Sequence, residues 1–319
     1  MSAGRIPLAV IVGPTASGKT ALAIALAKEF DGEVVSADSM QLYRGMDIAT
    51  AKPSVEEQEG IPHHLLDILE PSEGFSVAAY VARAGSVIAD IHARGKLPIL
   101  AGGTGLYVNS LVDGIRFEEA VGDKVVRARL LEEAERLGGE ALLARLREVD
   151  PETAETLHPN NRNRLVRALE VWEVTGLPMS EHRRRSRVAP PPYFTCMLGL
   201  SYTNRQALYA RINDRVDAML EAGLREEASR MLASGLCGTA AQAIGYKELR
   251  PYFAGESPLA DCVDRLKQET RRYAKRQLTW FRRDARIHWL YPDGEGGFPA
   301  VWEEARCILR KHLENTEKC

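Results

Sequence analysis

The first third of the chain alternates short apolar runs with stretches that have helical spacing. Residues 7–12 form a continuous apolar run, and two further short segments, EVVSA at 33–37 and LPILA at 97–101, are interpreted as buried strands. Residues 75–94 instead place Val and Ile at intervals of three and four, as on one face of a helix. Buried strands that alternate with helices predict an α/β fold with a parallel sheet, whose ligands bind at the carboxyl ends of the strands.

The pattern changes in the middle of the chain. Between residues 116 and 187 only helical patterns occur, interrupted by Gly and Pro, and a Pro-rich stretch then leads into another apolar run at 196–200. One more short strand is predicted at 287–290. An all-helical block between sheet strands indicates an insertion. We therefore predict a P-loop NTPase-like core, flanked by helices and formed by residues 1–119 and 193–319, with an inserted all-helical domain at 120–192.

Composition adds limits to this picture. The 319 residues are 45% hydrophobic and 27% charged, which is typical of a globular protein. None of the five cysteines is in a CxxC motif, so the spacing favours reduced thiols over disulfides or a zinc site. The adjacent His63 and His64 do not have metal-ligand spacing, and we interpret them as structural. Neither a signal peptide nor a membrane span is visible, so we expect a cytoplasmic protein without a membrane partner.

The formal net charge of -2 conceals a segregation of charge. Residues 1–115 hold 8 Lys/Arg and 13 Asp/Glu, whereas the remainder holds 34 and 31. Two segments are strongly basic: residues 158–187 contain seven Arg and three Glu, and residues 271–286 contain seven Lys/Arg and one Asp. Such segments are typical of a face that binds a polyanion, although solvated helix faces have the same composition.

The most specific motif follows the first strand. Its sequence, GPTASGKT, matches the P-loop pattern G-x-x-x-x-G-K-[ST] in the expected context of strand, loop and helix. Backbone amides of such a loop bind phosphate, the lysine adds a positive charge, and the final hydroxyl ligates Mg²⁺. The predicted phosphate-binding residues are Gly13, Pro14, Thr15, Ala16, Ser17, Gly18, Lys19 and Thr20, with Thr20 as the metal ligand.

Two polar residues follow the next strands. Asp38 comes after the second strand, where its carboxylate could act as a general base or, alternatively, cap a short helix at 39–43. The third strand ends in Gly102, Gly103 and Thr104, where many ATPases have an acidic residue that holds Mg²⁺. This absence argues against ATP hydrolysis and favours a site in which Thr104 hydrogen-bonds a substrate.

Seven segments in order resemble one family, the bacterial tRNA dimethylallyltransferases. They span almost the whole chain and read GPTASGKT (13–20), DSMQLYRGMDIATAKP (38–53), PHHLLDI (62–68), GGTGLY (102–107), HPNNRNRLVRALEV (158–171), IGYKE (244–248) and AKRQLTWFR (274–282). The chain has Ala49 where the family usually has Gly, which affects no proposed catalytic group.

The resemblance implies a function for the P-loop other than nucleotide binding. In this family the loop grips dimethylallyl diphosphate, with Mg²⁺, and the dimethylallyl group is transferred to N6 of the adenosine 3′ to the anticodon. The resemblance places the general base at Asp38 and a hydrogen bond to the same amine at Thr104. Lys19, Arg127 and Arg215 would complete the catalytic set, with Arg127 reaching the diphosphate or the RNA backbone.

The resemblance also implies where tRNA binds. Ser39, Met40 and Gln41 would line the pocket of the flipped base. From the helical insertion and the arginines beside its apolar stripe we further hypothesise that the insertion clamps the anticodon stem-loop, with contacts from Asn163, Arg164, Leu165, Val166 and Arg167. Within this segment the spacing indicates that Leu165 is buried, whereas Arg164 and Arg167 can follow phosphates. Aromatic residues in the segment 271–283 could stack on bases, but we interpret them as core residues. We expect a monomer.

Two other functions remain possible at this point. A P-loop small-molecule kinase would turn over ATP without RNA, and a non-catalytic RNA-binding NTPase would hydrolyse nucleotide when RNA is bound. The missing acidic residue after the third strand argues against both.

Overall fold

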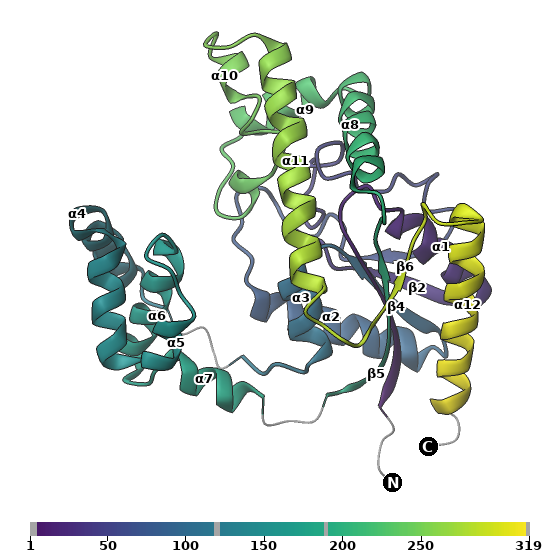
Figure 1. Cartoon of the computed structure of the whole chain (residues 1–319), viewed down its shortest axis with the longest axis horizontal. Helices are drawn as coiled ribbons and strands as arrows, with labels where there is room; N and C mark the ends of the chain where they lie inside the picture. Colours follow the sequence, from purple (N-terminus) through teal and green to yellow (C-terminus); the bar gives the residue numbers. More distant parts are fainter. Residues whose placement is uncertain (1–4, 118–121, 188–190, 317–319) are drawn as a thin grey trace. The chain divides into compact units, whose positions relative to one another are not determined.

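The computed structural model describes residues 5–117, 122–187 and 191–316. The chain divides into two compact units, one formed by Met1–Val112 with Pro192–Cys319 and the other by Asp113–Pro191 (Figure 1). The sequence-based boundaries of the insertion, 120 and 192, lie near those of the second unit.

The first unit is built on a six-stranded parallel sheet, so the predicted fold class is confirmed. The strand order is β3-β2-β4-β1-β5-β6. The strands are β1 (Ile6–Val12), β2 (Gly32–Ser36), β3 (His63–His64), β4 (Leu97–Gly102), β5 (Tyr193–Leu200) and β6 (Ile287–Leu290). β1 occupies a central position and pairs in register with β4 on one side and β5 on the other. The sequence did not predict β3, which is only two residues long.

Side chains of β1 alternate between two cores, as the two-residue period of a strand requires. Leu8, Val10 and Val12 contribute to one core, and Ala9 and Ile11 to the other. Helices therefore cover both faces of the sheet: α1 and α12 on one face, α2 and α3 on the other (Figure 1). The helices of this unit are α1 (Lys19–Glu29), α2 (Val77–Ala93), α3 (Gly105–Val112), α8 (Arg205–Glu221), α9 (Leu224–Ala233), α10 (Arg250–Phe253), α11 (Leu259–Phe281) and α12 (Gly297–Thr316), with a 3-10 turn at Ala240–Gln242.

The second unit is entirely helical within its described residues. Its helices are α4 (Lys124–Val149), α5 (Pro151–Glu155), α6 (Arg162–Thr175) and α7 (Met179–Ser186). A kink at Gly138 divides α4, and its two parts pack on α6 around Leu130, Leu146 and Leu169. The buried carboxylate of Asp150 caps α5 and also accepts the Ser180 N–H at 3.0 Å, which ties α7 to the bundle.

Candidate active site

The P-loop lies between β1 and α1 and has the backbone that phosphate binding requires. Gly13 and Gly18 have φ angles of 145° and 96°, which favour glycine, and Ala16 also has a positive φ. A Cβ on Gly13 would lie 2.6 Å from the Leu200 carbonyl oxygen, so only glycine fits beside β5. The Lys19 ammonium bends back over the loop and donates to the Pro14 carbonyl at 2.7 Å. The loop is thus preformed around its lysine.

Three charged groups at the P-loop influence one another. Burial, and secondly the nearby Arg215 guanidinium, lower the pKa of Lys19 to about 8, against the opposite effect of Asp38. Burial raises the pKa of Asp38, against the effects of the Met40 amide and of Lys19 and Arg215. Burial also lowers the pKa of Arg215. Two of the three groups are cationic, so the site favours an anion.

Asp38 lies two residues beyond β2, in the turn that leads into the next loop. One of its carboxylate oxygens, Oδ1, accepts the Met40 N–H at 2.9 Å, as a capping residue would. The alternative expectation of a helix at 39–43 is wrong, because these residues form turns and a single bridge from Tyr43 to Leu69. The Asp38 carboxylate therefore caps no helix, and Asp38 lines a cavity at this edge of the sheet.

Thr104 is held directly beside the Asp38 turn. Its hydroxyl accepts the Ser39 N–H at 3.0 Å, and its own N–H donates to the Ala37 carbonyl at 3.0 Å. This close approach explains Gly102, because a Cβ there would lie 2.3 Å from the Ala37 carbonyl. The ends of β2 and β4 thus bring Asp38 and Thr104 close together at one edge of the sheet.

Gln277 on α11 joins the P-loop to the loop after β4, and sequence reasoning did not identify it as a site residue. Its Oε1 accepts the Thr15 N–H at 2.9 Å, and its Nε2 donates to the Gly103 carbonyl at 3.0 Å. A Cβ on Gly103 would lie 2.1 Å from that Nε2, so glycine is required at this position. The buried amide therefore fixes the distance between the phosphate loop and Thr104.

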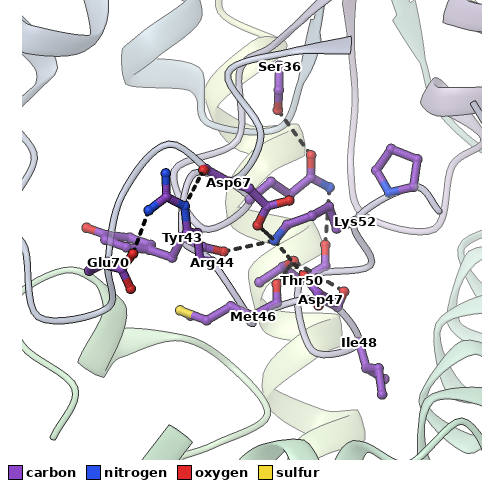
Figure 2. A network of polar contacts seen from close by, with 12 residues as sticks. Ser36, Tyr43, Arg44, Met46, Asp47, Ile48, Thr50, Lys52, Asp67 and Glu70 are labelled. Carbon is purple, nitrogen blue, oxygen red and sulfur yellow. Dashed lines mark hydrogen bonds and ion pairs between the residues drawn. The ribbon is translucent and has the colours of Figure 1, made fainter. Parts of the chain in front are cut away.

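The segment after Asp38 is held by a dense network of polar contacts (Figure 2). The Gln41 amide accepts from the Ser36 hydroxyl at 3.0 Å and donates to the carbonyls of Thr50 and Ala51 at 3.3 and 3.2 Å. Because its oxygen and its nitrogen are both engaged, the Gln41 side chain acts here as a brace for the wall of the site.

A buried ammonium group closes the same segment. The Lys52 side chain is only 6% exposed, donates to the Tyr43 carbonyl at 2.8 Å and pairs with the carboxylates of Asp47 and Asp67 (Figure 2). Three oxygens thus surround one buried cation, as burial of a charge requires.

Glu227 on α9 fixes the outer end of this segment. Its carboxylate accepts three successive backbone N–H groups, those of Asp47, Ile48 and Ala49, at 2.8 to 2.9 Å, and also the Tyr246 hydroxyl at 2.9 Å. The side chain lies in the interior, at 2% exposure. One carboxylate therefore connects the segment after Asp38 to the loop that precedes α10.

These elements enclose a cavity of about 400 Å³. Its polar wall comes from the sheet edge and includes Thr15, Lys19, Thr20, Asp38, Ser39, Gln41 and Arg215. Its apolar wall comes mainly from α8, α11 and the loop before α10 and includes Ile212, Val216, Met219, Leu224, Ile244 and Leu266. Such a cavity suits a ligand with an anionic end and an apolar group.

The remaining site predictions lie in the helical unit. Arg127 on α4 and Arg167 on α6 both approach the buried Glu170 carboxylate, while Arg164 is exposed. Leu165 and Val166 belong to the core of this unit, so their side chains are not available to RNA. Asn163 is exposed near the start of α6.

The RNA contacts of Arg127, Asn163, Arg164 and Arg167 stay predictions, as do the roles of the residues in the cavity. The aromatic residues of α11 differ in exposure: Phe281 is buried, whereas Trp280 is 37% exposed and donates from its indole nitrogen to Asn109.

The two adjacent histidines, His63 and His64, form β3. His64 bonds to the buried Glu33, whose pKa is lowered to about 2 mainly by its hydrogen bond from Arg94.

Comparison with known protein families gives one consistent match. The model of the family described as IPP transferase matches residues 41–284. A protein named tRNA dimethylallyltransferase from Caldanaerobacter subterraneus subsp. tengcongensis is 51% identical over 291 residues, which cover 90% of this chain and 92% of that protein. A protein of the same name from Geobacillus thermodenitrificans is 51% identical over 284 residues, or 89% and 90% of the two chains.

Solved structures agree with the sequence matches. A tRNA isopentenylpyrophosphate transferase from Bacillus halodurans is 44% identical, with a TM-score of 0.73 and coverage of 98% of both chains. A eukaryotic dimethylallyltransferase, solved acting on tRNA, is 31% identical, with a TM-score of 0.82 over 97% of this chain and 80% of that one. Among the described residues, no helix is long and apolar enough to cross a membrane.

Proposed function

The chain belongs to the IPP transferase family of tRNA dimethylallyltransferases, and from this premise we propose how its residues divide the reaction. The enzyme transfers a dimethylallyl group to an adenosine of tRNA. The proposal concerns the atoms involved: the donor is dimethylallyl diphosphate, and the acceptor is N6 of the adenosine 3′ to the anticodon. The observation that carries it is the cavity, whose polar wall holds residues of the phosphate loop together with the Asp38 carboxylate and whose other wall is apolar.

The reaction needs one bond to form and one to break. The adenine N6 attacks C1 of the dimethylallyl group, the bond between C1 and the diphosphate oxygen breaks, and the N6 proton passes to Asp38. Burial raises the pKa of Asp38, which makes its ionised form a stronger base. Thr104, held beside Asp38 through the Ser39 amide, would accept a hydrogen bond from the same amine.

The leaving diphosphate gains negative charge as the bond breaks. We assign its stabilisation to the P-loop amides, to Lys19, which already lies over the loop through its bond to the Pro14 carbonyl, and to Arg215, which lines the same cavity. A base stacked in RNA must leave the stack to reach such a site, and the turn at Ser39 and Met40 provides part of the cavity wall that would receive it.

The site offers a magnesium ion one protein ligand, Thr20. The described residues contain no cluster of three or more His, Cys, Asp or Glu side chains suited to hold a metal. The Thr20 hydroxyl lines the cavity and would supply one ligand, with the diphosphate and water as the others, which is how Mg²⁺ is usually bound at phosphates. When bound, the ion would neutralise charge on the leaving group.

The remaining elements of the proposal concern the partner and the cell. We propose that the helical unit binds the anticodon stem-loop through its basic residues, that the enzyme acts as a monomer and that it is cytoplasmic. Arg164 is exposed on α6, as a phosphate contact requires.

One assay tests the proposed chemistry. The protein is incubated with unmodified tRNA and either dimethylallyl diphosphate labelled in its carbon chain or ATP labelled in its γ-phosphate. We expect the carbon label to appear on the adenosine 3′ to the anticodon, with release of diphosphate. Transfer of the γ-phosphate label to a small molecule, or its RNA-dependent release, would favour a kinase or an NTPase instead.

A further inference from the structure

The tryptophan near the end of α11 has one edge fixed by the protein and the rest of its ring partly exposed. Trp280 lies where α11 contacts α3 (Figure 1). Its indole N–H donates to the Asn109 side chain at 3.2 Å. A Cβ on Gly105 would lie 2.2 Å from Cδ1 and 2.4 Å from Nε1 of the indole, so this edge rests on the backbone of α3. Trp280 is nevertheless 37% exposed, and it thus presents a fixed aromatic surface to the solvent.

A pocket of about 460 Å³ opens at this ring. It is lined by Asn109, Trp280, Arg283, Asp284, Ala285 and Arg286. The Asp284 carboxylate accepts from Nε and Nη2 of Arg286 at 2.8 and 2.6 Å. Arg283 is exposed, and within the described part of the chain it makes no ion pair. The pocket therefore combines an aromatic surface with an accessible cation.

One face of α11 connects this pocket with the active-site cavity. Arg276 lines the cavity, whereas Trp280 and Arg283 line the pocket. Because the three residues are spaced by four and three positions, they share a face of the helix. At 1.5 Å per residue, the step from Arg276 to Arg283 is about 10 Å. Lys275 and Arg282 are exposed beside this row and add positive charge. An RNA strand along this face can therefore place one base in the cavity and a nearby base at Trp280.

We propose that the Trp280 pocket is a second base-binding site, which stacks an unpaired base from the same RNA loop as the reacting adenosine. The proposal rests on the proposed function, because it takes tRNA as the substrate. Every base has a flat face that stacks on an aromatic ring, and loop bases are not held by pairing. A ring that is already fixed loses little freedom on binding, and Arg283 can contact the adjoining phosphate. Since most other residues of the pocket are polar or charged, it suits a nucleotide better than an apolar protein segment.

Two substitutions of Trp280 separate base stacking from a purely structural role. W280L keeps an apolar side chain without an aromatic face, whereas W280F keeps an aromatic ring. Both variants lose the hydrogen bond to Asn109. If Trp280 stacks on a base, W280L should bind an unmodified anticodon stem-loop RNA about tenfold more weakly, and W280F should stay within about threefold of the wild type. If Trp280 only holds α11 against α3, the two variants should bind RNA equally, and this result would overturn the proposal.

RNAs with single abasic positions identify the base that is bound. Each loop nucleotide except the reacting adenosine is replaced in turn by an abasic residue, and the affinities of the wild type and W280L are measured for each RNA. We expect one abasic position at which the two proteins bind equally, because the base that Trp280 contacts is missing there. At the other positions the difference between the two proteins should persist. A difference that persists at every position would contradict a specific base site.

A matched control is Tyr291, which is 42% exposed in the same unit but does not line the pocket. Y291L should bind RNA like the wild type, and a loss equal to that of W280L would overturn the proposal. Thermal unfolding of each variant identifies loss of fold. If W280L does not fold, tryptophan fluorescence decides the question. RNA should quench part of the emission of the wild type, and this part should be missing in W280F; equal quenching in both proteins would exclude Trp280 as the stacking residue.

Two further measurements keep this inference apart from the proposed function. Trp280 does not line the active-site cavity, so W280L should weaken RNA binding without a change in the Kd for dimethylallyl diphosphate. A parallel loss of both affinities would overturn a separate base site. The label-transfer assay on the wild type tests the reaction itself. If the wild type transfers no label, the proposed function fails, while the abasic RNAs still decide whether the Trp280 pocket binds a base.

Discussion

The pKa of Lys19 gives an expectation about substrate binding that can be worked out quantitatively. In the free protein this pKa is about 8, lowered by burial and by Arg215. About nine-tenths of the Lys19 side chains are then protonated at pH 7 and about one-tenth at pH 9. The diphosphate of the substrate binds the ammonium form, so binding above pH 8 requires uptake of a proton.

The sign and size of the effect follow from this linkage. A lowered pKa means that the charged form is lost as the pH rises through 8, and affinity for the diphosphate is lost with it. Between pH 7 and pH 9 the Kd for dimethylallyl diphosphate should therefore rise about tenfold. The diphosphate itself is already ionised over this range, so it contributes little to the change.

Titration calorimetry in two buffers with different ionisation enthalpies measures both the Kd and the proton uptake. We expect uptake to approach one proton at pH 9 and to be small at pH 7. Lys19→Met should bind more weakly at every pH and should show no dependence on pH between 7 and 9. A constant Kd for the wild type, or the same slope in Lys19→Met, would refute the assignment of this lysine to the phosphate site.

Three further substitutions test other parts of the site. Asp38→Ala should lower the single-turnover rate by about 10²–10⁴ and leave tRNA affinity nearly unchanged; a rate above about a tenth of wild type would exclude it as the general base. Gly102→Ala places a Cβ 2.3 Å from the Ala37 carbonyl and should destabilise the fold by about 3 kcal/mol in urea unfolding, whereas Gly74→Ala, with no atom within 4 Å, should not. Glu227→Ala leaves three backbone N–H groups without their acceptor and should cost about 2–4 kcal/mol; an unchanged unfolding midpoint would show that water replaces the carboxylate.

Local sequence patterns predicted the parts of the fold that depend on neighbouring residues. The strands β1, β2, β4, β5 and β6 were expected within two or three residues of their ends, because buried parallel strands read as short apolar runs. The turn glycines and the P-loop were equally visible. The sequence did not predict β3, because two adjacent histidines carry no periodic signal. Residues 39–43 resembled the start of a helix, because the preceding Asp38 is a typical capping residue, and it does make a capping bond to the Met40 N–H.

Contacts between residues far apart in the sequence could not be predicted from local patterns. Gln277 meets Thr15 across 262 positions, and Glu227 meets Ala49 across 178. Both are polar residues on amphipathic helices, where sequence alone suggests solvent. Which of them turns inward depends on how α9 and α11 pack over the sheet edge, and that is set by the whole topology. The same holds for Glu170, whose two partners come from separate helices.

The central position of β1 has a consequence for how the protein is made. β1 pairs with β4 and with β5, but β5 follows the entire helical unit in the sequence. During synthesis from the N-terminus, one edge of β1 therefore stays unpaired until the ribosome has also produced that unit. An unpaired apolar strand is a template for aggregation. A nascent chain stalled between α7 and β5 should thus need chaperone protection, although its P-loop and its helical unit have both been translated.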